Sequence, residues 1–223
     1  MKIDTIRRAI GLVALVLPMS WMAGTVAGQM RSTTAQAFGV SVNTPTVNQT
    51  SPYAVLPVGG GLAEDHGQTV AVPDLVTAQD AFAIVTGDAD PTYGSNAVSS
   101  ATLGAVNLLN GLITTDGVVA IATSTLGDGL AASDAEGSSL ANLIVNGTAV
   151  SDPAPNTRID LPDVGYVLLN EQRVTGDGVT TSGITVNMIH VVLQQPILGL
   201  LGQVIGYQTV GNIIVGSATS SVN

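Results

Sequence analysis

The stretch SGITVNMIHVVL, residues 182–193, decides the fold class of this 223-residue chain. In its first half apolar and polar residues alternate, and successive residues of a β-strand point to opposite faces of a sheet. Ile184, Val186 and His190 are therefore expected on one face, which we predict to be the core face. From Met188 onward both faces are apolar, as expected where a strand passes between two packed sheets.

Segments of the same kind recur along the chain. Runs of Val, Ile, Leu and Ala with few aromatic residues are interrupted every ten residues or so by Gly, Ser, Thr or Asn, which is typical of a sandwich or barrel. We predict an all-β fold, a β-sandwich of mainly antiparallel strands with hairpin connections. The expected strands lie at residues 38–43, 69–72, 80–86, 97–106, 117–125, 139–145, 157–161, 165–173, 182–193 and 210–220.

Two Asn-Gly pairs predict hairpin turns. Asn110-Gly111 and Asn146-Gly147 each lie between apolar runs. This dipeptide accepts the two positive φ angles of a type I′ turn, so both positions are expected to join neighbouring strands.

The N-terminus has the pattern of a secretory signal peptide. Basic residues, among them Arg7 and Arg8, precede a short apolar run and then a region of small residues. We predict cleavage after Ala37, with Ala27 as the alternative, so that residues 1–37 are the signal and residues 38–223 form a single domain. The apolar run is too short to span a bilayer, and we expect no transmembrane anchor.

Removal of residues 1–37 leaves Arg158 and Arg173 against fifteen acidic residues, with no lysine. Such a surface repels phosphate groups, so binding to nucleic acid and to anionic membranes is not expected. Cations are the favoured partners. The chain also has no cysteine, which excludes disulfides and thiolate chemistry.

Catalytic and metal-binding patterns are weak. The two histidines, His66 and His190, are in no ligand-spaced cluster; His66 is expected in a Gly-rich loop and His190 in the core. No G-x-S-x-G motif occurs, and we predict that the protein is not an enzyme and needs no cofactor. Calcium is the alternative, because Asp88, Asp90 and Asn96 supply oxygen ligands around one turn.

The uncharged segment PILGLLGQVIG, residues 196–206, has no polar face. We favour a buried hairpin. The alternative is an exposed apolar tip or a donated strand that docks on a neighbouring subunit.

The second half of the chain resembles a known family. SLANLIVNG, PNTRIDLP, GYVLLNEQ, SGITVNMIHVVL and GNIIVGSATS follow one another in the order and spacing of the choice-of-anchor P family of bacterial surface proteins, over roughly residues 97–222. The resemblance implies a surface protein whose shared domain has no assigned activity. Asn212 stands where we expect aspartate in that family.

The resemblance singles out Asn170, Glu171, Asn187 and His190 on predicted strands. Buried polar groups require hydrogen bonds, so we predict that these four form one structural network.

Together these features predict a secreted, non-catalytic structural or adhesive protein of the cell surface or extracellular matrix, which acts by surface contact. Its partner is expected to be an envelope or matrix component or another copy of the chain. The alternatives are an extracellular module that binds carbohydrate or calcium, and a subunit of a strand-donating filament.

Overall fold

The computed structural model of the protein describes residues 31–90 and 94–223, which contain strands and no helix. The strands are β1 (Thr33–Asn43), β2 (Asn48–Val55), β3 (Gly61–Val72), β4 (Val76–Asp90), β5 (Gly94–Leu103), β6 (Val106–Leu108), β7 (Ile113–Thr115), β8 (Gly117–Gly127), β9 (Leu130–Asp134), β10 (Ser139–Ala141), β11 (Leu143–Val145), β12 (Thr148–Val150), β13 (Thr157–Leu161), β14 (Gly165–Gly176), β15 (Ser182–Leu198) and β16 (Val204–Val222).

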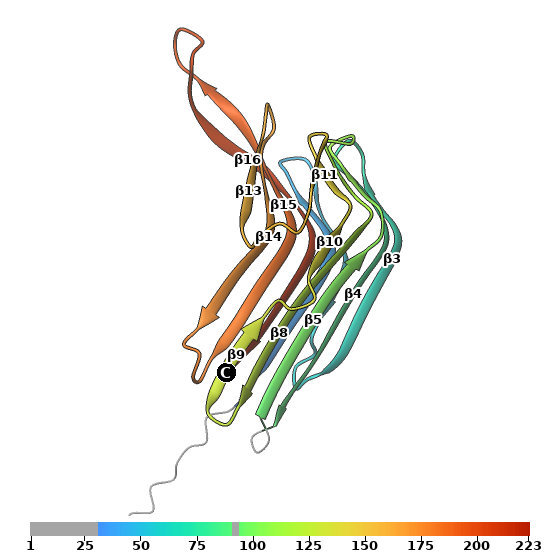
Figure 1. Ribbon diagram of the computed structural model, residues 1–223, viewed down its shortest axis with the longest axis vertical. Helices are drawn as coiled ribbons and strands as arrows, with labels where there is room; N and C mark the ends of the chain where they lie inside the picture. Colours follow the sequence, from blue (N-terminus) through green and yellow to red (C-terminus); the bar gives the residue numbers. More distant parts are fainter. Residues whose placement is uncertain (1–30, 91–93) are drawn as a thin grey trace, which may run out of the picture.

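The strands form two antiparallel sheets that pack face to face (Figure 1). The first sheet has six strands in the order β13-β14-β15-β16-β1-β2. The second has ten, in the order β10-β8-β5-β4-β6-β7-β11-β12, with β3 paired to β4 and β9 paired to β8. The predicted all-β sandwich is confirmed.

The core between the sheets changes in character along its length. Large aliphatic side chains such as Val40, Ile189 and Ile213 fill one part, whereas the other part also contains many alanines and serines. There, the hydroxyl oxygens of Ser124 on β8 and Ser220 on β16 lie 2.7 Å apart and join the two sheets by a buried hydrogen bond. Small side chains allow this close approach, and the hydrogen bond offsets the cost of burying the hydroxyls.

Five strands of the six-stranded sheet, all but β13, reverse their inside-outside alternation. On β15 the buried side chains are those of Ile184, Val186 and Met188 before the reversal. After it they are those of Ile189 and Val191. The period of two therefore holds on each side of the reversal but changes phase across it.

The reversal lies on one row that crosses five strands. Pairing is interrupted on every strand at the same level, while the register on the two sides stays the same. The residues of this reversal row are Asn170 on β14, Met188 on β15, Gly216 on β16, Gly39 on β1 and Pro52 on β2. Asn170 and Gly216 have positive φ angles of 50° and 67°. Figure 1 shows that the strands bend near the middle of the sandwich.

Glycine is required at the centre of the reversal row. A Cβ atom on Gly216 would lie 2.5 Å from Cγ1 of Val118 on the opposite sheet. A Cβ on Gly39 would lie 3.2 Å from Cβ of Ala81, also on the opposite sheet. The two sheets therefore approach each other closely where the pleat reverses.

We expect Gly216→Ala to lower the free energy of unfolding by about 2–4 kcal/mol. The cost of a Cβ atom at a left-handed backbone position and the cost of its clash with Val118 add together. Gly147→Ala is the matched control, since Gly147 also has a positive φ of 74° but open space around it. The control should lose only about 1–2 kcal/mol. Urea denaturation measures both; equal losses would contradict the role of the close approach.

Several strands differ from their predicted extent. The first strand begins at Thr33 and not at residue 38, and β2, β7, β9 and β12 were not predicted. His66 lies on β3, so its expected place in a loop is wrong. Short polar strands such as β2 lack the apolar runs on which the prediction depended.

The two Asn-Gly hairpins are present, with one difference. Asn146 and Gly147 form a two-residue turn with positive φ angles, as predicted. The turn at Asn110 has four residues between the pair Leu108 and Ile113, so it is longer than a type I′ hairpin.

Residues 1–30 of the predicted signal peptide lie outside the described residues. Ala35 and Ala37 are buried in the core, and Thr33 pairs with Val222 at the end of β16. Cleavage after Ala37 would remove the first half of β1, whereas cleavage after Ala27 would leave it whole. Among the described residues no helix is long and apolar enough to cross a membrane.

Candidate functional site

The outstanding surface feature is a hairpin formed by the ends of β15 and β16. The pairing of β14 with β15 stops at Leu193, and that of β1 with β16 stops at Asn212. Beyond these residues the two strands pair only with each other, over Gln194–Leu198 and Val204–Thr209. Figure 1 shows the hairpin projecting away from the sandwich.

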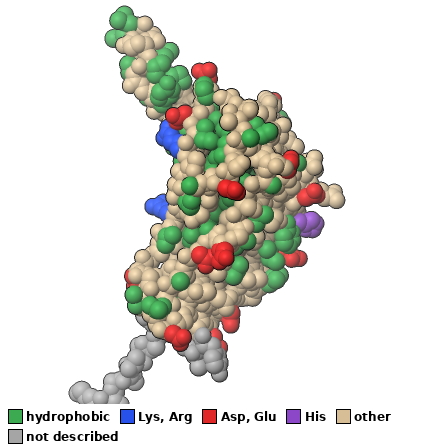
Figure 2. Space-filling model, viewed as in Figure 1, with side chains coloured by type: hydrophobic (Ala, Val, Ile, Leu, Met, Phe, Trp, Pro, Cys, Tyr) green, Lys and Arg blue, Asp and Glu red, His purple; other side chains and the backbone are tan. Residues whose placement is uncertain are grey.

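The hairpin is apolar and exposed. Leu200 and Leu201 at its tip are fully exposed, at 105% and 93%. Figure 2 shows hydrophobic side chains along the projection and no charged ones. The expected burial of residues 196–206 is wrong, and the alternative of an exposed apolar tip describes this structure. The other exposed large hydrophobic residues of the hairpin are Ile197, Leu198, Val204, Ile205 and Tyr207.

The tip is a closed turn. The amide of Gly199 donates to the carbonyl oxygen of Gln203 at 2.8 Å, and the amide of Gly202 donates to the carbonyl oxygen of Gly199 at 2.9 Å. The side-chain oxygen of Gln203 accepts a hydrogen bond from the amide of Leu201 at 3.1 Å. Three amides of the tip therefore find their acceptors within the turn itself, which presents two exposed leucine side chains.

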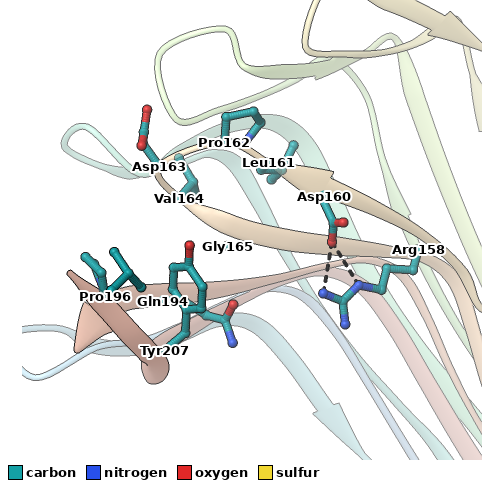
Figure 3. Close-up of a pocket in the computed structure, with 11 residues that line it drawn as sticks. Arg158, Asp160, Leu161, Pro162, Asp163, Val164, Gly165, Gln194, Pro196 and Tyr207 are labelled. Atoms are coloured by element: carbon teal, nitrogen blue, oxygen red, sulfur yellow. Dashed lines mark hydrogen bonds and ion pairs between the residues drawn. The ribbon is translucent and has the colours of Figure 1, made fainter. Parts of the chain in front are cut away.

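A groove of about 640 Å³ lies at the base of the hairpin. Tyr207 and Pro196 line it from the hairpin, and the turn between β13 and β14 lines the opposite side (Figure 3). Arg158 contributes a charge, donates two hydrogen bonds to Asp160 and stacks 3.9 Å above the ring of Tyr166. The groove therefore combines an exposed aromatic ring with an exposed ion pair.

A second polar site lies on the outward face of the six-stranded sheet. Oε2 of Glu171 lies 2.9 Å from Nδ1 of His190 and accepts a hydrogen bond from Nδ2 of Asn187 at 2.8 Å. Nε2 of His190 lies 3.1 Å from Oδ1 of Asn212. Asn187 in turn accepts a hydrogen bond from Ser217 at 2.7 Å. We call these five residues the histidine network.

The predicted network is brought together in part. Glu171, Asn187 and His190 are joined, but Asn170 donates instead to the carbonyl oxygen of Pro153 and accepts from Gln172. The expected core position of His190 is wrong, because the reversal at Met188 turns it to the same outward face as Asn187.

The histidine network favours a charged imidazole ring. Hydrogen bonding to Glu171 raises the pKa of His190, and hydrogen bonding from His190 lowers the pKa of Glu171. Both ring nitrogens face acceptor oxygens, which suits a ring that donates twice. Both ring nitrogens therefore have hydrogen-bond partners within the chain, and the structural role of the network stays a prediction.

The pH dependence of this pair follows from the two pKa shifts. His190, with its raised pKa, stabilises the fold fully below about pH 6.5, and this contribution is lost as the pH rises through its folded pKa. Glu171, with its lowered pKa, stabilises the fold above about pH 4.5, and this is lost as the pH falls through its folded pKa. The pair therefore contributes most between these two values.

We expect Glu171→Gln to lower the pKa of His190, measured by NMR, and to reduce the free energy of unfolding by about 1–3 kcal/mol at pH 5.5. The loss should be smaller at pH 9, because the contribution of the His190 charge is lost as the pH rises through its folded pKa. Asp160→Asn is the control, since its pair with Arg158 is exposed and should contribute little. An equal loss at both pH values for Glu171→Gln would contradict the ion pair.

The calcium candidates lie together at the far end of the β4–β5 hairpin. Asp88 and Asn96 face each other across the ladder, and Asp90 opposes Gly94. All three line a shallow hollow that Asp128 also borders. Among residues 31–90 and 94–223, no group of three or more His, Asp or Glu side chains lies close enough to hold a metal ion. Calcium binding stays a prediction.

Sequence reasoning missed Ser217 as a member of the histidine network and noted Asn212 only as a departure from the family pattern. Both lie on β16, whose ladder with β15 places Ser217 opposite Asn187 and Asn212 opposite Val192. A polar residue within an apolar run was the available signal for Asn212, whereas Ser217 lies in the run GSATSS of small, mostly polar residues. Knowledge of the strand register was needed to use it.

No protein-family model, curated protein or solved structure matches this chain. The resemblance to the choice-of-anchor P family therefore stays a prediction.

Proposed function

We propose that this protein is an exported, non-catalytic structural or adhesive component of the cell surface or extracellular matrix, and that it acts by surface contact. The projecting apolar hairpin is the observation that carries this proposal. Exposed contiguous apolar surface is costly in water and marks interaction sites in soluble proteins. The apolar side chains of this hairpin gather on one charge-free projection, and the turn at its tip is well formed.

The histidine network supports a non-catalytic role. Its histidine is held between a carboxylate and an amide oxygen, with no hydroxyl within hydrogen-bonding distance of either ring nitrogen in the described residues. Ser217 donates its proton to Asn187. A nucleophilic hydroxyl activated by histidine needs a direct hydrogen bond between the two groups.

Fractionation of cells that produce the protein tests this function. We expect the native protein to be retained with the envelope or matrix fraction, and the variant Leu200→Ser/Leu201→Ser to shift several-fold toward the culture medium. Val174→Ser is the control, because Val174 is 65% exposed on β14 and lies outside the hairpin. If the double variant and the native protein distribute alike, the hairpin is not the contact surface.

The groove at the base of the hairpin favours a second candidate, an extracellular carbohydrate-binding module. Binding sites combine apolar surface with a few placed polar groups, and here Tyr207, Gln194 and the Arg158–Asp160 pair line one groove. We expect a glycan array to give hits that Arg158→Ala abolishes. An array without hits for the native protein would remove this candidate.

A further inference from the structure

We propose that the hairpin of β15 and β16 binds a second copy of this chain, edge to edge through β16. The inference rests on the proposed function, because it names the partner of the same contact surface. It follows from the free edge of β16, the exposed hydrophobic side chains of the hairpin and the absence of charged residues there. A lipid bilayer, the alternative partner, would leave the strand edges without hydrogen bonds.

The outer edge of β16 is free along the hairpin. Residues 204–210 of this strand extend past Asn212, where its pairing with β1 ends. A free strand edge presents unpaired amide and carbonyl groups, and these groups pair readily with a strand of another chain.

The outer edge of β15 is less suitable. Pro196 lies in the middle of this part of the strand, opposite Tyr207. Proline has no amide hydrogen to offer a neighbouring strand and is found on edges that stay unpaired. Residues 204–210 of β16 contain no proline, so β16 is the edge available for pairing.

The exposed side chains of the hairpin favour an apolar partner. Seven of them are large and hydrophobic, and each of these residues is at least 41% exposed. A second copy that brings the same hairpin would cover this surface with an equally apolar one.

Charge favours contact through the hairpin and disfavours contact elsewhere. The chain is acidic, with a formal net charge of −10, so most of its surface repels a second copy. No Asp, Glu, Lys or Arg occurs from residue 178 to residue 223. Salt screens the remaining repulsion, and self-association should therefore strengthen as the salt concentration rises.

A lipid bilayer is a poorer partner than a second copy. Inside hydrocarbon the two free edges of the hairpin would leave amide and carbonyl groups without hydrogen bonds, which costs several kcal/mol for each group. Pairing with another β16 instead provides those hydrogen bonds. The net negative charge also opposes approach to anionic lipids.

Self-association of the purified protein, measured by sedimentation equilibrium at low and high salt, tests the proposal. We expect reversible dimers that tighten with salt, and at least a tenfold rise in Kd for Ile205→Asp. Leu130→Asp is the matched control, since Leu130 is 66% exposed and Ile205 is 63% exposed. Circular dichroism confirms that both variants are folded. A native protein that stays monomeric at high salt, or an equal effect of both variants, would overturn the proposal.

Cysteine crosslinking tests the edge itself, because the chain has no cysteine of its own. In a two-fold symmetric antiparallel pair, one position of β16 lies opposite its own copy. Single cysteines placed in turn at residues 204–210 should give disulfide-linked dimers at one or two neighbouring positions. Equal crosslinking at every position, or none, would overturn the β16 edge as the contact.

Two further measurements separate this inference from the proposed function. If the native protein is monomeric but binds the envelope fraction, only the self-association is wrong. If it neither self-associates nor binds the envelope, both are wrong. If a monomeric protein binds phosphatidylcholine vesicles, the partner of the hairpin is lipid and not a second copy of the chain.

Discussion

The reversal of the pleat across the six-stranded sheet is the constraint on which the rest of the structure depends. Because each strand changes phase at the same level, both halves of the sheet present apolar side chains to the core. The same change turns His190 to the outward face, beside Glu171 and Asn187. If a strand kept one constant alternation along its whole length, the polar side chains of one half would point into the core.

Close packing at the reversal row requires small residues from both sheets. Gly39 and Gly216 face Ala81 and Val118 across the sandwich. Beyond the reversal row the core also contains small side chains. There, Ser124 and Ser220 join the two sheets by a hydrogen bond among buried alanines. The chain contains no disulfide, and its stability depends on this tight fit between small side chains and on the larger aliphatic core beside it.

The sequence was sufficient to predict the fold class and most strands, because alternation and turn residues are local signals. It was insufficient for the face of His190, since a constant period of two was assumed and the left-handed Asn170 and Gly216 are visible only in the structure. The hairpin was expected to be buried because its residues are apolar. Its exposure depends on where β1 ends and where β14 begins, which is a property of the whole sheet.

The placement of the hairpin also has a mechanical consequence. Ser32 and Asn223 hydrogen-bond to each other at the end of the sandwich opposite the hairpin (Figure 1), and β16 runs without a break from Val204 to Val222. A pull between the hairpin and Asn223 acts along this strand, so its covalent backbone carries the force and the ladder hydrogen bonds are not opened one by one. A pull that separates Ser32 from Asn223 breaks the ladder of β1 and β16 one pair at a time. The fold is therefore stiff along the hairpin axis and weak across its terminal strands.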